Sequence, residues 1–92
     1  MNQNEIFDKS IARWGFDLQA DVLIEEMSEL TKAIIKARRT GSKITPEMVE
    51  EMADVSICLS QIRREAAKKG YDFAPIHEAK LKRLDERLTS TI

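Results

Sequence analysis

Two pairs of acidic residues are the part of this sequence best suited to chemistry. Glu26 and Glu29 form one pair and Glu51 and Asp54 the other, and on a helix the i, i+3 spacing places both carboxylates of a pair on one face. Each pair adjoins an apolar stripe, so we expect the acids at the edge of a helix–helix interface. Four converging carboxylates repel one another and are costly to desolvate unless cations neutralise them. The pairs therefore predict a site for a hard cation such as Mg²⁺, which binds oxygen ligands and supports phosphate chemistry.

The alternative is a solvated helix surface, since glutamate is a good helix former and is common on helix exteriors. Here, however, both pairs are displaced by roughly 90° from the centres of two apolar stripes, and in the same rotational sense. Two other metal sites are excluded, because the sequence has no EF-hand loop pattern and its single histidine, His77, lacks the Glu-x-x-His partners of a di-iron bundle. The matched offsets favour the Mg²⁺ site.

The composition is that of one small globular domain, residues 1–92. Hydrophobic residues make up 42% and charged residues 34%, which excludes a disordered chain, and the net charge of −1 argues against a general nucleic-acid binder. The single cysteine, Cys58, excludes an internal disulfide and a thiolate zinc cluster; it lies in an apolar run, so we expect it to be at least half-buried. No apolar run has transmembrane length and the first residues do not resemble a signal peptide, which predicts a cytoplasmic protein with no membrane partner.

The elements that must position the acids are helices separated by short breakers. The strongest start signal is Thr45-Pro46-Glu47: a capping hydroxyl, a proline at the first helical position and an acid in the first turn. Nothing in the sequence alternates like a strand. We predict an all-α bundle of about four helices, with the two long ones packed antiparallel and the bundle completed by oligomerisation. The expected helices cover residues 4–13, 17–40, 46–69 and 75–88.

Apolar stripes predict which sides of the two long helices meet. The first stripe is Leu23, Met27, Leu30, Ile34 and Ala37. The second is Met48, Met52, Val55, Leu59, Ile62 and Ala66. We expect these two stripes to face each other, with the acidic pairs on their flanks.

The acidic residues also resemble the signature of a known family. Glu25-Glu26-x-x-Glu29, followed after 21 residues by Glu51-x-x-Asp54, is similar to the motif of the MazG-type all-α NTP pyrophosphohydrolases. The resemblance extends over residues 14–88 and includes Trp14-Gly15, Gln19 and the Lys/Arg-rich last helix. The joint pattern, with its helical context, is much more specific than E-x-x-E alone.

The resemblance implies Mg²⁺-dependent hydrolysis of an NTP or dNTP between the α and β phosphates, giving a monophosphate and pyrophosphate. Mn²⁺ would be a possible substitute. Glu26, Glu29, Glu51 and Asp54 would be the metal ligands, and with Glu25, a candidate for orienting or deprotonating the attacking water, they would form the catalytic set. Relatives assemble as homodimers or homotetramers and act in nucleotide-pool control, which the resemblance implies here too.

Substrate-binding residues are implied on both sides of the acidic motif. Lys80, Arg83 and Arg87 lie on one stripe of the last helix and could bind triphosphate oxygens, although such a stripe is also typical of a solvated face. Trp14 and Gln19 could contact the base; alternatively, Trp14 and Phe16 seal the end of the bundle.

Two alternative functions remain open at this point. The first is a phosphoribosyl-ATP pyrophosphatase-like enzyme, which shares the acidic pattern within the same superfamily. The second is a non-catalytic helical dimerisation module, whose apolar seam would associate and whose acids would serve only solubility.

Overall fold

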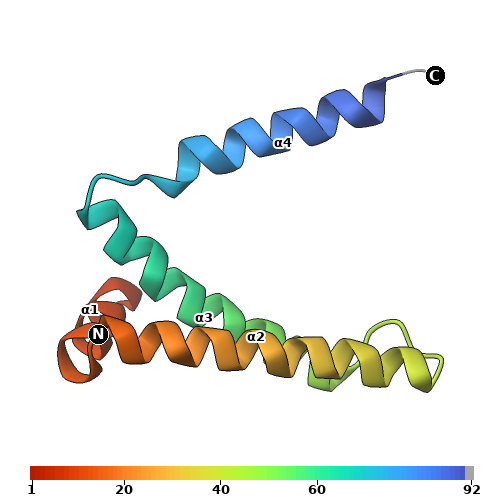
Figure 1. Ribbon diagram of the computed structural model, residues 1–92, viewed down its shortest axis with the longest axis horizontal. Coiled ribbons are helices and arrows are strands. Elements are labelled where there is room, and N and C mark those ends of the chain that lie inside the picture. Colours follow the sequence, from red (N-terminus) through yellow and green to blue (C-terminus); the bar gives the residue numbers. More distant parts are fainter. Residues whose placement is uncertain (91–92) are drawn as a thin grey trace.

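Four α-helices make up the fold in the computed structural model, which describes residues 1–90 (Figure 1). The described residues form no β-strand, so the predicted all-α class is confirmed. Within the same range, none of the helices combines the length and apolar character that crossing a membrane requires. The helices are α1 (Gln3–Trp14), α2 (Phe16–Arg39), α3 (Pro46–Lys68) and α4 (Phe73–Thr89).

Side-chain caps and glycines fix where the helices begin and end. The Thr45 hydroxyl accepts a hydrogen bond from the Met48 amide at 3.2 Å, and Pro46 occupies the first turn, as the sequence predicted. Between α1 and α2 the chain turns at Gly15 alone, whose φ of +87° suits a residue without a Cβ. Because this single residue suffices for the turn, α2 begins at Phe16 and not at Asp17.

α2 and α3 form an antiparallel hairpin closed by the loop of residues 40–45 (Figure 1). Ala33 and Ala37 of α2 and Met48 of α3 are the buried residues of its core, with Ile34 packed against them. Small side chains on α2 let the two backbones approach closely near the loop. An ion pair between Lys36 and Glu47, 3.3 Å from nitrogen to oxygen, joins the helices at the same end.

The seam between α2 and α3 is rotated relative to the predicted stripes. On α3 the seam runs through Glu51 and Cys58, whereas Met52 and Leu59 are exposed. On α2, Glu26 is half-buried, as are Leu23 and Leu30 of the predicted stripe, whereas Met27 is exposed. The predicted stripes therefore face each other in part: Ile34, Ala37 and Met48 lie in the core of the hairpin, whereas Met27, Met52 and Leu59 are left on an adjacent, exposed face.

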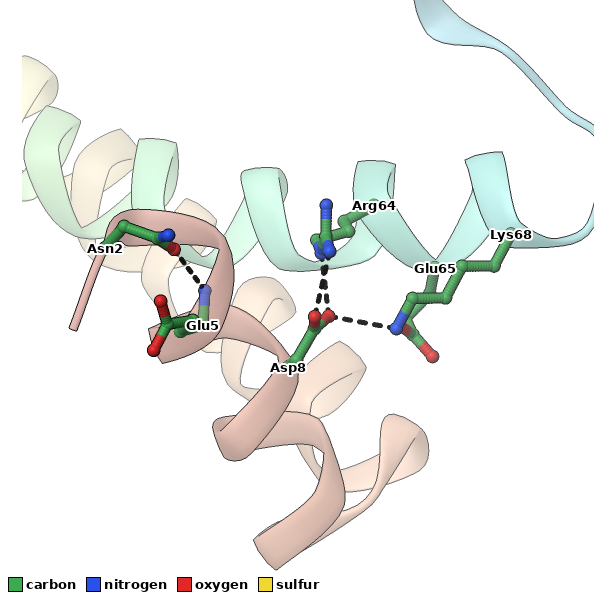
Figure 2. Close-up of polar contacts among 6 residues, drawn as sticks. All are labelled: Asn2, Glu5, Asp8, Arg64, Glu65 and Lys68. Atoms are coloured by element: carbon green, nitrogen blue, oxygen red, sulfur yellow. Dashed lines mark hydrogen bonds and ion pairs between the residues drawn. The ribbon is translucent and has the colours of Figure 1, made fainter.

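α1 packs against both long helices and is held by a cluster of charges. Figure 2 shows the Asp8 carboxylate receiving two hydrogen bonds from the Arg64 guanidinium, at 2.7 and 2.9 Å, and one from the Lys68 ammonium at 2.9 Å. Lys68 also contacts Glu65 at 2.8 Å. Phe7, next to Asp8, is buried. The hydrogen bonds from Arg64 and Lys68 hold the pKa of Asp8 well below its usual range.

We expect Asp8→Asn to lower the melting temperature by a few degrees near pH 7. Because the pKa of Asp8 is lower in the folded protein than in the unfolded chain, its contribution is present above the ordinary carboxyl pKa and is lost as the pH falls below it. Thermal melts of wild type and variant should therefore converge between about pH 5 and pH 2. Asp21→Asn, which removes an exposed acid from α2, is the matched control; equal losses from both variants would contradict the role of Asp8.

α4 does not close the bundle. It contacts only α3, through its first residues, and then runs away from the hairpin (Figure 1). The guanidinium of Arg63 lies over the Phe73 ring at 3.7 Å, and Phe73 stacks on His77. Every residue from Ala74 to Thr89 is exposed. Three helices thus pack together, and the predicted fourth is present but leaves its apolar side uncovered.

Candidate metal site

Three of the predicted metal ligands come together across the α2–α3 hairpin. Glu26, Glu51 and Asp54 each offer a carboxylate oxygen, and these oxygens all lie within 4.8 Å of one another. Glu26 comes from the middle of α2, and Glu51 and Asp54 come from the second and third turns of α3, which the antiparallel packing brings opposite Glu26. We call these three residues the acidic triad. Glu26 and Glu51 are half-buried, and Asp54 is exposed, so the triad opens to solvent on one side.

The triad carries charge that its surroundings do not compensate. Burial raises the pKa of both Glu26 and Glu51, and the nearby charge of Asp54 raises both further. One oxygen of Glu51, Oε2, is buried without a hydrogen-bond partner. None of the ion pairs between described residues involves the triad. Uncompensated, partly desolvated carboxylates are the donor set that a hard divalent cation stabilises.

The other two motif acids lie beside the triad. Glu29 pairs with Lys32 at 3.3 Å, one turn further along α2, and is not one of the converging groups. Its charge nevertheless raises the pKa of Glu26 and Glu51, so it is close enough to act on them. Glu25 is exposed and contributes to the same effect at Glu26. The structure thus brings together three of the four predicted ligands and leaves Glu29 engaged by a lysine.

Cys58 is a neighbour of the triad that the sequence reasoning did not connect with it. The thiol is buried, as predicted. Burial raises the pKa of Cys58, and the charges of Glu26 and Asp54 raise it further. The missed signal was the i, i+4 spacing of Asp54 and Cys58, which puts them on one helix face.

We expect Cys58 to react at least ~10-fold more slowly with a disulfide reagent near pH 8 in the folded protein than in urea. The reason is that both burial and the adjacent acids disfavour the thiolate. Glu26→Gln removes one of these charges and should raise the rate in the folded protein. Glu25→Gln is the matched control, since Glu25 is exposed and does not act on the thiol. Equal rates in Glu26→Gln and wild type would contradict the electrostatic part of this explanation.

The predicted base-binding residues do not form one surface. Trp14 is exposed at the end of α1, with the Arg13 guanidinium over its ring at 5.4 Å. Gln19 is buried on α2, with 7% of its surface accessible. Phe16 is also exposed, so the alternative in which Trp14 and Phe16 seal the bundle end does not describe this structure.

The predicted phosphate-binding residues are separated from the triad in the same chain. Lys80, Arg83 and Arg87 are exposed on α4, which contacts neither α1 nor α2. Figure 1 shows α4 diverging from the hairpin over its whole length. The structure therefore does not bring the cationic stripe and the acids together within one chain.

A groove of about 560 Å³ lies at the far end of α3, lined by residues of α1, of α3 and of the start of α4. It contains no residue of the triad. Sequence reasoning missed the groove because its walls come from three helices in different parts of the chain, and no local sequence pattern reveals such a combination. The side chains that line it include Asn4, Phe7, Ser60, Arg63, Lys68 and Phe73.

Comparisons of this chain with protein-family models, with curated proteins and with solved structures each find no match. The resemblance to the MazG-type enzymes therefore stays a prediction from the acidic motif, and the function is argued from the triad itself.

Proposed function

We propose that this chain is a Mg²⁺-dependent nucleoside triphosphate pyrophosphohydrolase. The observation that carries the proposal is the convergence of Glu26, Glu51 and Asp54 from two helices, with one Glu51 oxygen buried and unpartnered. A cluster of this kind is unfavourable without a cation, yet the sequence builds it at the centre of the hairpin. The same residues are the ones that the resemblance to the family marks as metal ligands.

The reaction adds water across the α–β phosphoanhydride. A bond forms between the water oxygen and one phosphorus, the bond to the bridging oxygen breaks, and the products are a monophosphate and pyrophosphate. Bound Mg²⁺ would supply charge neutralisation of the phosphate oxygens and a lowered pKa for a water ligand. Mn²⁺ would substitute.

The residues of the chain divide these tasks. The triad holds the cation, and Glu29 completes the ligand set once Lys32 releases it. Glu25 is exposed next to the triad, where it can orient the attacking water. Trp14 and Gln19 remain the proposed base contacts, and Lys80, Arg83 and Arg87 the proposed phosphate contacts.

Oligomerisation, as a homodimer or homotetramer, would complete the bundle. The exposed apolar side of α4 and its separation from the triad both support this part of the proposal. The same exposure is the observation that favours the second candidate function, a non-catalytic helical dimerisation module.

The test is release of pyrophosphate from a panel of NTPs, dNTPs and phosphoribosyl-ATP in the presence of Mg²⁺ or Mn²⁺. We expect pyrophosphate and the matching monophosphate in equal amounts from at least one nucleotide. Preference for phosphoribosyl-ATP would favour the related enzyme of the same superfamily. Release of inorganic phosphate alone would rule out α–β cleavage. Absence of turnover, together with a melting temperature indifferent to metal, would favour the dimerisation module.

A further inference from the structure

The groove at the far end of α3 has no part in the proposed function. Its volume is about 560 Å³, and its walls come from α1, from the last turns of α3 and from the start of α4. Asp54 is the triad residue nearest to it along α3, and it precedes Arg63 by about 14 Å along the helix axis. The groove is therefore separate from the triad, and its own side chains decide what it can bind.

Three cations of α3 line the groove: Arg63, Arg64 and Lys68. Two of them are held in place from the side of α1, where the Asp8 carboxylate accepts two hydrogen bonds from Arg64 and one from Lys68 (Figure 2). Lys68 also contacts Glu65 at 2.8 Å. A guanidinium has five N–H donors and an ammonium has three, so both side chains keep unused donors after these contacts. Positioned cations with unused donors favour the binding of an anion.

Arg63 differs from the other two cations, because no carboxylate offsets its charge. None of the ion pairs between residues 1–90 involves Arg63. Its guanidinium lies over the Phe73 ring, 3.7 Å from the ring centroid, and His77 stacks on the same ring. Stacking of this kind holds the plane of a guanidinium and leaves its N–H edge available for a bidentate pair with an oxyanion. An anion can therefore bind Arg63 without breaking an ion pair.

The ends of two helices add to the attraction for an anion. The first turn of α1 lines the groove through Gln3 and Asn4, and the first turn of α4 lines it through Phe73 and Ala74. The N-terminal end of a helix carries a partial positive charge. Asp72 is the acid among the lining residues, and its carboxylate accepts a hydrogen bond from the Ala74 amide at 3.3 Å. Three cations and one acid therefore line the groove.

Neutral polar side chains complete the walls. Gln3, Asn4 and Ser60 line the groove, and their side chains form no hydrogen bond with other residues in the range 1–90. Amide and hydroxyl groups both donate and accept, so they match the hydroxyls of a ligand. A flat base is matched less well, because Phe7 is buried and the Phe73 ring already lies against a guanidinium. The walls therefore favour an anion whose body carries hydroxyl groups.

We propose that this groove binds a small phosphomonoester with a hydroxylated body, such as a sugar phosphate. The phosphate lies at Arg63, within reach of the unused donors of Arg64 and Lys68, and the hydroxyls of the body meet Ser60 and Asn4. A phosphate suits the three cations better than a carboxylate does, because a phosphomonoester carries nearly two negative charges and three acceptor oxygens. Binding needs neither the metal nor the triad, so the inference does not depend on the proposed function.

A ligand in the groove would contact α1, α3 and the start of α4 at the same time. The α4 helix is otherwise attached to the remainder of the fold only through its first residues. Binding therefore stabilises the position of α4 as well as that of α1. At a tenfold excess over its Kd, the ligand should raise the melting temperature in EDTA by about 5 to 10 °C.

Isothermal titration calorimetry of the full chain in EDTA tests the proposal, with ribose 5-phosphate, inorganic phosphate and ribose as probes. We expect ribose 5-phosphate to bind with a Kd below about 1 mM, inorganic phosphate to bind more weakly, and ribose not to bind. Arg63→Gln should weaken the binding of ribose 5-phosphate at least ~10-fold, because it removes the unpaired guanidinium. Arg39→Gln is the matched control, since Arg39 is an exposed arginine at the other end of the hairpin. This control should bind as wild type does.

Amide NMR spectra of wild type locate the binding without any substitution. Ribose 5-phosphate should shift the signals of Asn4, Ser60 and Arg63 and leave those of Glu26 and Glu51 in place. Shifts centred on the triad would overturn the proposal, and so would wild-type affinity in Arg63→Gln. Tighter binding of inorganic phosphate than of ribose 5-phosphate would overturn the hydroxylated body. A chain that binds ribose 5-phosphate in the groove but releases no pyrophosphate from nucleotides would contradict only the proposed function.

Discussion

Replacing Glu51 with glutamine is expected to reduce pyrophosphate release by on the order of 10³-fold or more, because it removes the central ligand of the triad. Glu51 offers the buried, unpartnered oxygen and lies within 4.8 Å of both Glu26 and Asp54. A glutamine keeps the shape of the side chain but removes the charge that a hard cation requires. The loss should therefore appear in metal binding as well as in turnover.

The same substitution should change stability in opposite directions with and without Mg²⁺. At 100-fold excess over its Kd, Mg²⁺ should raise the melting temperature of wild type by about 10 °C, and Glu51→Gln should lose most of that gain. Without metal, the raised pKa of Glu51 means that, at a pH between its ordinary and its raised pKa, the folded protein holds a proton that the unfolded chain gives up. Stability therefore falls as the pH rises from the ordinary carboxyl pKa through the raised one. Glu51→Gln removes this loss and should melt a few degrees higher than wild type near pH 7.

Glu50→Gln is the control for these measurements, because it makes the same chemical change one residue away. Glu50 is exposed and is not one of the converging groups. Glu50→Gln should keep both the metal-dependent rise in melting temperature and the wild-type turnover. Calorimetric melts of the three proteins in EDTA and in Mg²⁺ separate the possibilities. A metal-free Glu51→Gln that is less stable than wild type would contradict the electrostatic strain in the triad. If the melting temperature of Glu51→Gln rose with Mg²⁺ as much as that of wild type, the result would contradict the metal site.

Local features of the fold followed from sequence because they depend on neighbouring residues. Thr45 and Pro46 start α3 where the capping pattern placed them, and Gly41 and Gly70 follow the helix ends with positive φ. The acids of the triad were found in the same way, from i, i+3 spacing on two helices. The pairing of Glu29 with Lys32 has the same spacing and was also within reach of local reasoning.

The side of each helix that faces its partner could not be read from hydropathy alone. Ile34, Ala37 and Met48 of the predicted stripes do lie in the core, but the larger Met27, Met52 and Leu59 are exposed. The smaller Ala33 and Cys58 permit closer packing and occupy the seam in their place. This rotation places Glu26 and Glu51 nearer the interface than predicted, which is why their pKa is raised by burial. Which side of a helix packs against its partner depends on how well the two helix surfaces fit each other, and neither sequence segment alone contains that information.

The direction of α4 also lay beyond the sequence. The sequence predicted it as one of about four helices in a bundle, and its cations as contacts for the phosphates of a nucleotide. The hydrogen bonds of Gly70 and Tyr71 and the contact of Arg63 with Phe73 send it elsewhere. A four-residue connection thus sets the direction of α4 and keeps its cations away from the triad of the same chain.

Replacing Lys80, Arg83 and Arg87 together with glutamine is expected to raise the KM for nucleotide by roughly 10- to 100-fold, because three phosphate contacts are lost. The melting temperature should change little, since all three side chains are exposed. Replacing Lys82, an exposed cation on another side of α4, is the control. An unchanged KM in the triple variant would mean that the stripe is simply solvated.

Mixing this triple variant with Glu51→Gln decides which chain the cations serve. If α4 acts on the partner, a mixed dimer contains one intact site, with acids from the triple variant and cations from Glu51→Gln. Random exchange of equal amounts should then restore about a quarter of the wild-type activity at limiting nucleotide, because half of the dimers are mixed and each has one good site of two. If α4 acts on its own chain, no intact site can form, and the activity of the mixture stays at the mean of the activities of the two variants. Exchange itself is verified by the transfer of a fluorescent label between the two proteins. A gain of activity on mixing is therefore a direct sign that the site is shared between two copies, and its absence after full exchange places the cations and the acids in one chain.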